Sequence, residues 1–223
     1  MKLRTGKGLC VLGMLAAAAA VGPSVAAAQP GVTDAVWTVH PQTASASAAV
    51  NVLTLNDQRH INNRIGARIG PDGRLLLTAP EGLGDPDGSG ANCALDNAKP
   101  GETSATEVSC EAGYIGAIVG DLSGGRDVFD ADPRLSVMVG GVINGVARPL
   151  SGGPGRDRLI GGALPDLLRG GAGADSLIGS GGADVLVGGG GRDKLLGGTG
   201  RDRCRGNGGV DTVKSCELVR SIP

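Results

Sequence analysis

The 223-residue chain has a formal net charge of −1, 42 glycines, and only one residue each of Trp, Tyr and Phe. A net charge this close to zero argues against a nucleic-acid-binding protein, and so few aromatic side chains exclude a large aromatic core. The composition favours a narrow aliphatic core, which is typical of a solenoid whose short units each bury one or two side chains against their neighbours.

Residues 1–28 are predicted to be a secretory signal peptide. A short basic segment precedes an apolar run over residues 9–21, and small residues lead up to a cleavage site after Ala28. A retained membrane anchor is the alternative, but the run is shorter than the roughly 20 residues that a bilayer requires. We therefore expect export by the general secretory pathway, loss of Cys10 with the peptide, and no membrane span in the mature chain.

Residues 29–133 are predicted to be rich in β-structure. Short apolar or alternating runs predict strands at 51–55, 64–69 and 74–78, and "GPDG" at 70–73 predicts a turn. Residues 81–106 are polar and rich in Gly, Pro, Asn and Asp, so we expect a long loop there.

Four cysteines are left after cleavage, an even number in a chain expected to reach an oxidising compartment. Proximity favours Cys93 with Cys110 and Cys204 with Cys216, although four cysteines allow three connectivities. Zinc is the alternative use, but the chain has no C-x-x-C pair, and its histidines, His40 and His60, are distant in sequence.

A degenerate coil is predicted at residues 114–133, where Gly124, Gly125, Asp127 and Phe129 outline a glycine–aspartate motif out of phase with the repeats that follow. Residues 134–151 are interpreted as inserted strands or a linker.

Residues 152–214 hold seven repeats of nine residues, followed by a predicted cap at 215–223. Each repeat has a glycine five positions before an aspartate and an apolar residue two positions after it. The aspartates are Asp157, Asp166, Asp175, Asp184, Asp193, Asp202 and Asp211. This constant interval indicates a repeat architecture and not merely a low-complexity sequence.

The repeats combine residue types that suit calcium. Glycine adopts positive φ without penalty, so a short loop can curl and direct its carbonyl oxygens to one point, and an aspartate adds a charged oxygen. Calcium takes six to eight such oxygens, and parallel strands about 4.8 Å apart could hold an ion between them. The candidate metal ligands are Gly153, Gly155, Asp157, Gly171, Gly173, Asp175, Gly182, Asp184, Gly189, Gly191, Asp193, Gly198, Gly200, Asp202, Gly209 and Asp211.

The stretch "GGAGADSLI" (170–178) resembles G-G-x-G-x-D-x-U-x, the nonapeptide of the repeats-in-toxin (RTX) or haemolysin-type calcium-binding family. The resemblance covers 152–214 and implies an all-β fold, a parallel β-roll in which two nonapeptides make one coil. It also implies two columns of aspartates, one with Asp157, Asp175, Asp193 and Asp211 and the other with Asp166, Asp184 and Asp202, with Ca²⁺ between stacked loops.

The chain departs from that family pattern beside the aspartates. The preceding residue is commonly Asn or Asp in the family, but here it is Arg156, Arg192 or Arg201 in three repeats. These arginines predict weaker calcium binding and could neutralise the columns without metal. The second repeat has Leu164 and Pro165 in its loop, so its site is expected to form least well.

The resulting hypothesis is a secreted, extracellular calcium-binding protein whose folding is coupled to the ion, and not an enzyme. The chain lacks H-E-x-x-H and G-x-S-x-G, and Asp85 and Asp87 suit a solvated turn. Two alternatives stay open: a metal-free β-solenoid whose aspartates bond nearby amides, and an adhesive or cell-surface interaction module in which calcium is only structural or absent.

Overall fold

The computed structural model describes residues 35–42, 50–57, 62–84, 93–96, 104–111, 115–143 and 145–220, which form twenty β-strands and no helix. The predicted signal peptide (1–28) lies outside these residues, as do His60, Asp85 and Asp87. Within the described part of the chain, no helix has the length and apolar character needed to span a membrane.

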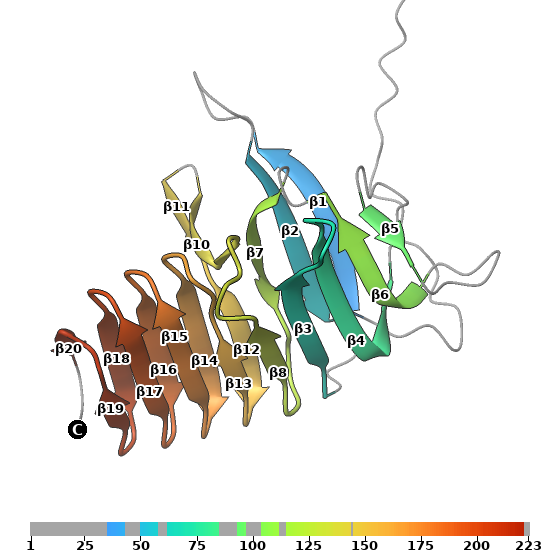
Figure 1. Ribbon diagram of the computed structural model, residues 1–223. Helices are drawn as coiled ribbons and strands as arrows, with labels where there is room; N and C mark the ends of the chain where they lie inside the picture. Colours follow the sequence, from blue (N-terminus) through green and yellow to red (C-terminus); the bar gives the residue numbers. More distant parts are fainter. Residues whose placement is uncertain are drawn as a thin grey trace, which may run out of the picture.

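The nonapeptide repeats form a parallel β-roll with two columns of stacked strands (Figure 1). One column contains β12 (Leu150–Gly155), β14 (Leu167–Gly173), β16 (Val185–Gly190), β18 (Arg203–Gly208) and β20 (Leu218–Arg220). The other contains β13 (Arg158–Ile160), β15 (Ser176–Gly181), β17 (Lys194–Thr199) and β19 (Thr212–Lys214). Leu168 pairs with Leu186 and Leu177 with Leu195, so two nonapeptides make one coil. The predicted all-β parallel roll is confirmed.

One apolar side chain per repeat fills the interior of the roll. Side chains alternate between the two faces of a strand, so the second residue of each strand from β13 to β18 points inward while its neighbours are more exposed. The inward residues are at most 2 % exposed: Leu159, Leu168, Leu177, Leu186, Leu195 and Cys204. The same apolar core continues into the strands N-terminal to the roll, where Leu53 and Leu75 are fully buried.

The N-terminal sheet contains the strands expected from the sequence. β2 (Val50–Asp57) and β3 (Arg64–Ile69) include the first two predicted runs, and β4 (Leu75–Gly84) begins one residue into the run predicted at 74–78. The turn at 70–73 is present, with the Gly73 N–H donating to the Gly70 carbonyl at 3.0 Å. β1 (Ala35–Gln42) pairs antiparallel with β2.

The segment 81–106 differs from the long loop expected there. It contains the end of β4, all of β5 (Cys93–Leu95) and the start of β6 (Ser104–Cys110). β6 pairs antiparallel with both β4 and β5. These inter-strand hydrogen bonds stabilise extended backbone in spite of the Gly- and Pro-rich composition.

Residues 115–131 form one further coil of the roll. β7 (Ile115–Asp121) pairs in parallel with β2 and β12, and β8 (Val128–Ala131) pairs in parallel with β3 and β13. After this coil come β9 (Met138–Val139) and a hairpin of β10 (Gly141–Ile143) and β11 (Val146–Arg148), which projects from the roll in Figure 1. The insertion explains why the motif around Asp127 is out of phase with the repeats.

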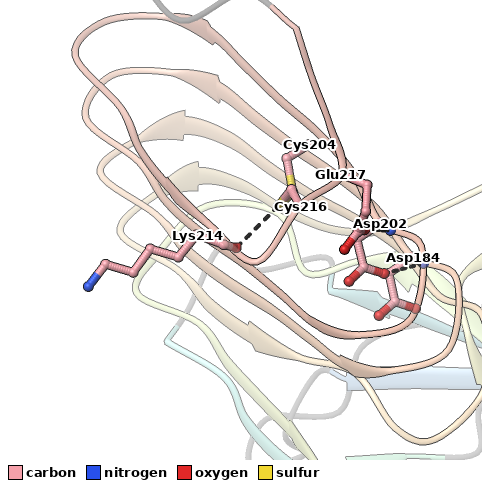
Figure 2. Close-up of a disulfide and its surroundings, with 6 residues drawn as sticks. All are labelled: Asp184, Asp202, Cys204, Lys214, Cys216 and Glu217. Carbon is pink, nitrogen blue, oxygen red and sulfur yellow. Dashed lines mark hydrogen bonds between the residues drawn. A yellow bond between two sulfur atoms is a disulfide. The ribbon is translucent and has the colours of Figure 1, made fainter.

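Two disulfides join the cysteine pairs favoured by the sequence. Cys93 and Cys110 are cross-strand partners on β5 and β6. Cys204 of β18 is bonded to Cys216, which lies between β19 and β20 at the end of the roll (Figure 2). Because all four thiols are oxidised in pairs, they cannot form the thiolate zinc site considered as an alternative.

Candidate metal centre

The repeat loops turn through glycines in the left-handed region. Nine of the ten candidate glycines have positive φ, and Gly155 is the exception. The coils also stack too closely for a side chain at these positions. A Cβ on Gly173, Gly191 or Gly209 would lie 1.5, 1.9 or 1.6 Å from a carbonyl oxygen of the preceding coil. These glycines therefore permit both the turn and a close stack of backbone carbonyls.

The aspartates form two hydrogen-bonded ladders inside the roll. In the first, the backbone N–H of Asp157 donates to Asp175 Oδ1 at 2.8 Å, and the same bond at 2.9 Å links Asp175 to Asp193 and Asp193 to Asp211. In the second, Asp166 donates to Asp184 at 2.8 Å and Asp184 to Asp202 at 2.9 Å. These ladders are the two columns expected from the roll.

Both ladders extend beyond the regular repeats. The N–H of Asp127 donates to Asp157 Oδ1 at 2.9 Å, and the N–H of Asn63 donates to Asp127 Oδ1 at 2.8 Å. At the other end, the N–H of Asp202 donates to Glu217 Oε2 (Figure 2).

The candidate ligands chosen from the sequence did not include these end residues. Asp127 lies 30 residues before Asp157, and Glu217 lies 15 after Asp202, whereas ladder neighbours within the repeats are 18 apart. A search for a period of nine passes over both. Both residues could have been found by looking for a carboxylate one coil beyond each end of the repeats.

One oxygen of most ladder carboxylates, Asp166 excepted, has no hydrogen-bond partner. Among the described residues, buried Oδ2 atoms without a partner belong to Asp127, Asp157, Asp175, Asp184, Asp193, Asp202 and Asp211. An ionised carboxylate oxygen removed from water without a partner is costly. Each of these carboxylates would therefore be stabilised either by a bound proton or by a cation at its Oδ2 atom.

The unpartnered oxygen faces the first glycine of its repeat. A Cβ on Gly179 would lie 2.1 Å from Asp184 Oδ2 and 2.5 Å from the Gly197 carbonyl oxygen. For Gly170 the corresponding distances are 2.4 Å to Asp175 Oδ2 and 2.6 Å to the Gly188 oxygen. A carboxylate oxygen and a carbonyl oxygen thus both border a space that only glycine leaves open. The candidate ligand set omitted these first glycines, although their fixed position five residues before each aspartate was visible in the sequence.

Asp166, in the repeat that contains Leu164 and Pro165, has both carboxylate oxygens hydrogen-bonded. Its Oδ1 accepts from the Val139 N–H at 2.6 Å, and its Oδ2 accepts from the Gly162 N–H at 2.7 Å. This carboxylate therefore lacks the free oxygen found in the other repeats.

Burial raises the pKa of the ladder carboxyls. Desolvation is the main cause, and the backbone N–H donated by the neighbouring coil opposes it. The pKa is raised to about 6 for Asp127, Asp157 and Asp175 and to about 7 for Asp166 and Asp184. Neighbouring ladder carboxylates raise it further; for Asp175 these are Asp157 and Asp193.

The donor set suits a hard cation. Within the described residues, no three His, Cys, Asp or Glu side chains gather closely enough to hold a metal, so an ion between coils would depend on one or two carboxylates and on backbone carbonyls. All these donors are oxygens, which calcium prefers and soft metals do not. The unpartnered Oδ2 atoms therefore fit calcium.

The arginines beside the aspartates do not replace such an ion. Arg156, Arg192 and Arg201 are exposed, and none of them bonds to a ladder carboxylate. The ion pair found in the described part of the chain joins Arg134 to Asp132, away from both ladders.

Comparison with known protein families identifies the repeats. Residues 151–186 and 178–213 match the RTX calcium-binding nonapeptide repeat, which contains four copies of the motif. The resemblance noted in the sequence is thereby confirmed for residues 151–213, and the N-terminal sheet lies outside the match. Neither a curated protein nor a solved structure matches the chain.

Proposed function

We propose that the repeat loops bind Ca²⁺ between stacked coils. The observation that carries the proposal is the series of buried, unpartnered Oδ2 atoms along both ladders. The ligands are the carboxylates of Asp175, Asp184, Asp193 and Asp202, with Asp157 and Asp211 contributing at the ends, and the carbonyl oxygens of the glycines in the same loops. A bound cation supplies the positive charge that these buried carboxylates lack.

Calcium binding in this protein is coupled to the stability of the roll. Only the folded chain stacks the loops, so the ion binds the folded state and shifts the equilibrium toward it. The ion also offsets the repulsion between carboxylates that face each other within a ladder.

The setting we propose is extracellular, and the role is binding without catalysis. The basic and apolar start of the chain supports export, and the two disulfides suit an oxidising compartment. The division into a signal peptide (1–28), a β-rich region (29–133), an insertion (134–151), the repeats (152–214) and a cap (215–223) is part of this proposal.

Isothermal titration of calcium into the full chain tests the proposal. Asp184→Asn keeps an oxygen that can accept the Asp166 amide but removes the carboxylate charge, so we expect fewer ions bound per chain. Asp130→Asn is the matched control, because Asp130 is exposed and lies outside both ladders. No heat from millimolar calcium, or identical titrations for wild type and Asp184→Asn, would refute the proposal.

The second candidate is a metal-free roll that acts as an interaction module. The Oδ1 bonds favour it, since each ladder aspartate already accepts a backbone amide of the adjacent coil. Under this alternative the Oδ2 atoms are protonated instead of bound to a metal, and ligand binding by the protein is independent of calcium.

A further inference from the structure

A groove of about 850 Å³ runs along the column of strands that carries the first ladder. Its lining residues come from the first positions of β3, β8, β13, β15, β17 and β19 and from the loops just before them. These strands are consecutive neighbours in the sheet. Six strands spaced about 4.8 Å apart give the groove a length of roughly 24 Å. It lies across the strands, not along an open sheet edge.

The surface of the groove is cationic. The basic side chains that line it are all exposed: Arg64, Arg126, Arg156, Arg158, Arg192 and Lys194. None of them forms an ion pair within the described part of the chain. The aspartates that also line the groove, Asp127, Asp157 and Asp175, are at most 2 % exposed and direct their carboxylates into the ladder. The positive charge is therefore available to a ligand.

The basic residues that follow the ladder positions recur at a regular spacing. Direct cross-strand pairing places the following residues in one row across the sheet: Arg64, Val128, Arg158, Ser176, Lys194 and Thr212. A cation occupies every second strand, and a small uncharged residue occupies each strand between. Successive cations in the row are therefore two strand spacings of about 4.8 Å apart, and this separation is close to the length of a disaccharide. Ser176, Thr212 and Asn62 offer hydroxyl and amide groups between the charges.

The chemistry of the lining selects among extended anions. No described lining residue is aromatic, so the bases of a single-stranded nucleic acid would have no surface for stacking. The chain as a whole carries a charge of −1, unlike the strongly basic domains that bind nucleic acids. Guanidinium groups recognise carboxylates through paired hydrogen bonds. We propose that this groove binds a carboxylated polysaccharide that lies across the coils of the roll.

The test measures binding of oligogalacturonates, from the disaccharide to the octasaccharide, to the full chain. Fully methyl-esterified oligomers are the matched ligand control, since they keep the sugars and lose the charge. Titrations in chelator and in calcium separate this groove from the calcium sites. We expect affinity to rise with length until the sugar chain spans the groove, in both conditions, and no binding of the esters.

Two double variants test the location. Arg158→Gln/Lys194→Gln removes two cations from the row and should weaken binding roughly tenfold, as expected for the loss of hydrogen bonds to charged groups. Arg169→Gln/Arg205→Gln removes two exposed cations of the other column and should leave affinity unchanged, with both variants retaining the wild-type circular dichroism spectrum. Equal weakening by the two variants, or binding of the esters, would overturn the proposal. Tighter binding of poly-glutamate or single-stranded DNA at equal charge would overturn the polysaccharide assignment.

Discussion

Each ladder aspartate within the regular repeats, apart from Asp166, uses only one of its two carboxylate oxygens for hydrogen bonding. Oδ1 accepts an amide of the neighbouring coil, as in the 2.9 Å bond from Asp184 N–H to Asp202, while Oδ2 stays buried and unpartnered. The position and period of these residues could be predicted from the sequence. The sequence could not predict that one oxygen of each of these carboxylates accepts an amide while the other stays unpartnered, because this depends on how adjacent coils stack.

The raised pKa of these carboxyls predicts that the metal-free protein is more stable in mild acid. The folded chain holds protons on Asp157, Asp175 and Asp184 up to about pH 6 or 7, whereas the unfolded chain releases them near the usual 3.8. Stability is therefore greatest below about pH 4 for these groups and is lost as pH rises through 6 to 7. In chelator, the melting temperature should be lower at pH 8 than at pH 5.

Calcium should reverse that trend, because protons and the cation compete for the same oxygens. In saturating calcium the melting temperature should rise from pH 5 to pH 8. If the melting temperature in chelator increased from pH 5 to pH 8, the ladder carboxyls would be ionised in the folded protein without loss of stability, which would contradict this prediction.

Ser180 stands where five other repeats have glycine, and its φ of 79° lies in the left-handed region. That conformation costs a non-glycine residue about 1–2 kcal/mol. Ser180→Gly should therefore raise the free energy of unfolding by about 1 kcal/mol, measured by urea denaturation in calcium. Ser180→Ala, which retains a Cβ, is the control and should bring no such gain. Equal stability of the two variants would contradict the strain inferred at this position.

At the scale of elements, the roll was predictable and its ends were not. The constant interval of nine specifies coil length and the inward leucines, and hence the pairing of Leu168 with Leu186. No period marks β5, whose pairing with β6 depends on residues distant in sequence, or the ladder end at Glu217. The groove likewise required the structure, since only the register places Arg64 in a row with Arg158.

The Cys204–Cys216 disulfide is predicted to hold the last strands on the roll. Neither β19 nor β20 has a further strand stacked beyond it in the described chain, and Leu218 and Val219 of β20 are 44 % and 41 % exposed. The double variant Cys204→Ser/Cys216→Ser should lose about 2–3 kcal/mol of stability and show faster amide hydrogen exchange in β18–β20.

Cys93→Ser/Cys110→Ser provides the matched control for that experiment. This pair joins β5 to β6 in the N-terminal sheet, so its loss should leave exchange in β18–β20 unchanged. Unaltered exchange after removal of Cys204 and Cys216 would show that strand pairing alone holds the end of the roll.

Over the whole roll, the ladder carboxylates lie inside and the basic side chains of the repeats lie outside. The ladder aspartates other than Asp211 are almost fully buried, while the arginines of the groove face solvent. The net charge of −1 is therefore the sum of two separated sets of charges. The buried carboxylates favour a cation, and the exposed basic side chains favour an anion. Calcium would offset the internal charge and leave the groove free for its ligand.

The central claim is that calcium stabilises the fold through the ladder carboxylates. Thermal unfolding of the full chain at pH 8, followed by far-ultraviolet circular dichroism in chelator and in millimolar calcium, tests it most directly. We predict a higher melting temperature in calcium, since each site contributes about 2.7 kcal/mol at a hundredfold excess over Kd, and a smaller increase for Asp184→Asn. Superimposable melting curves with and without calcium, at equal β-content, would contradict the claim.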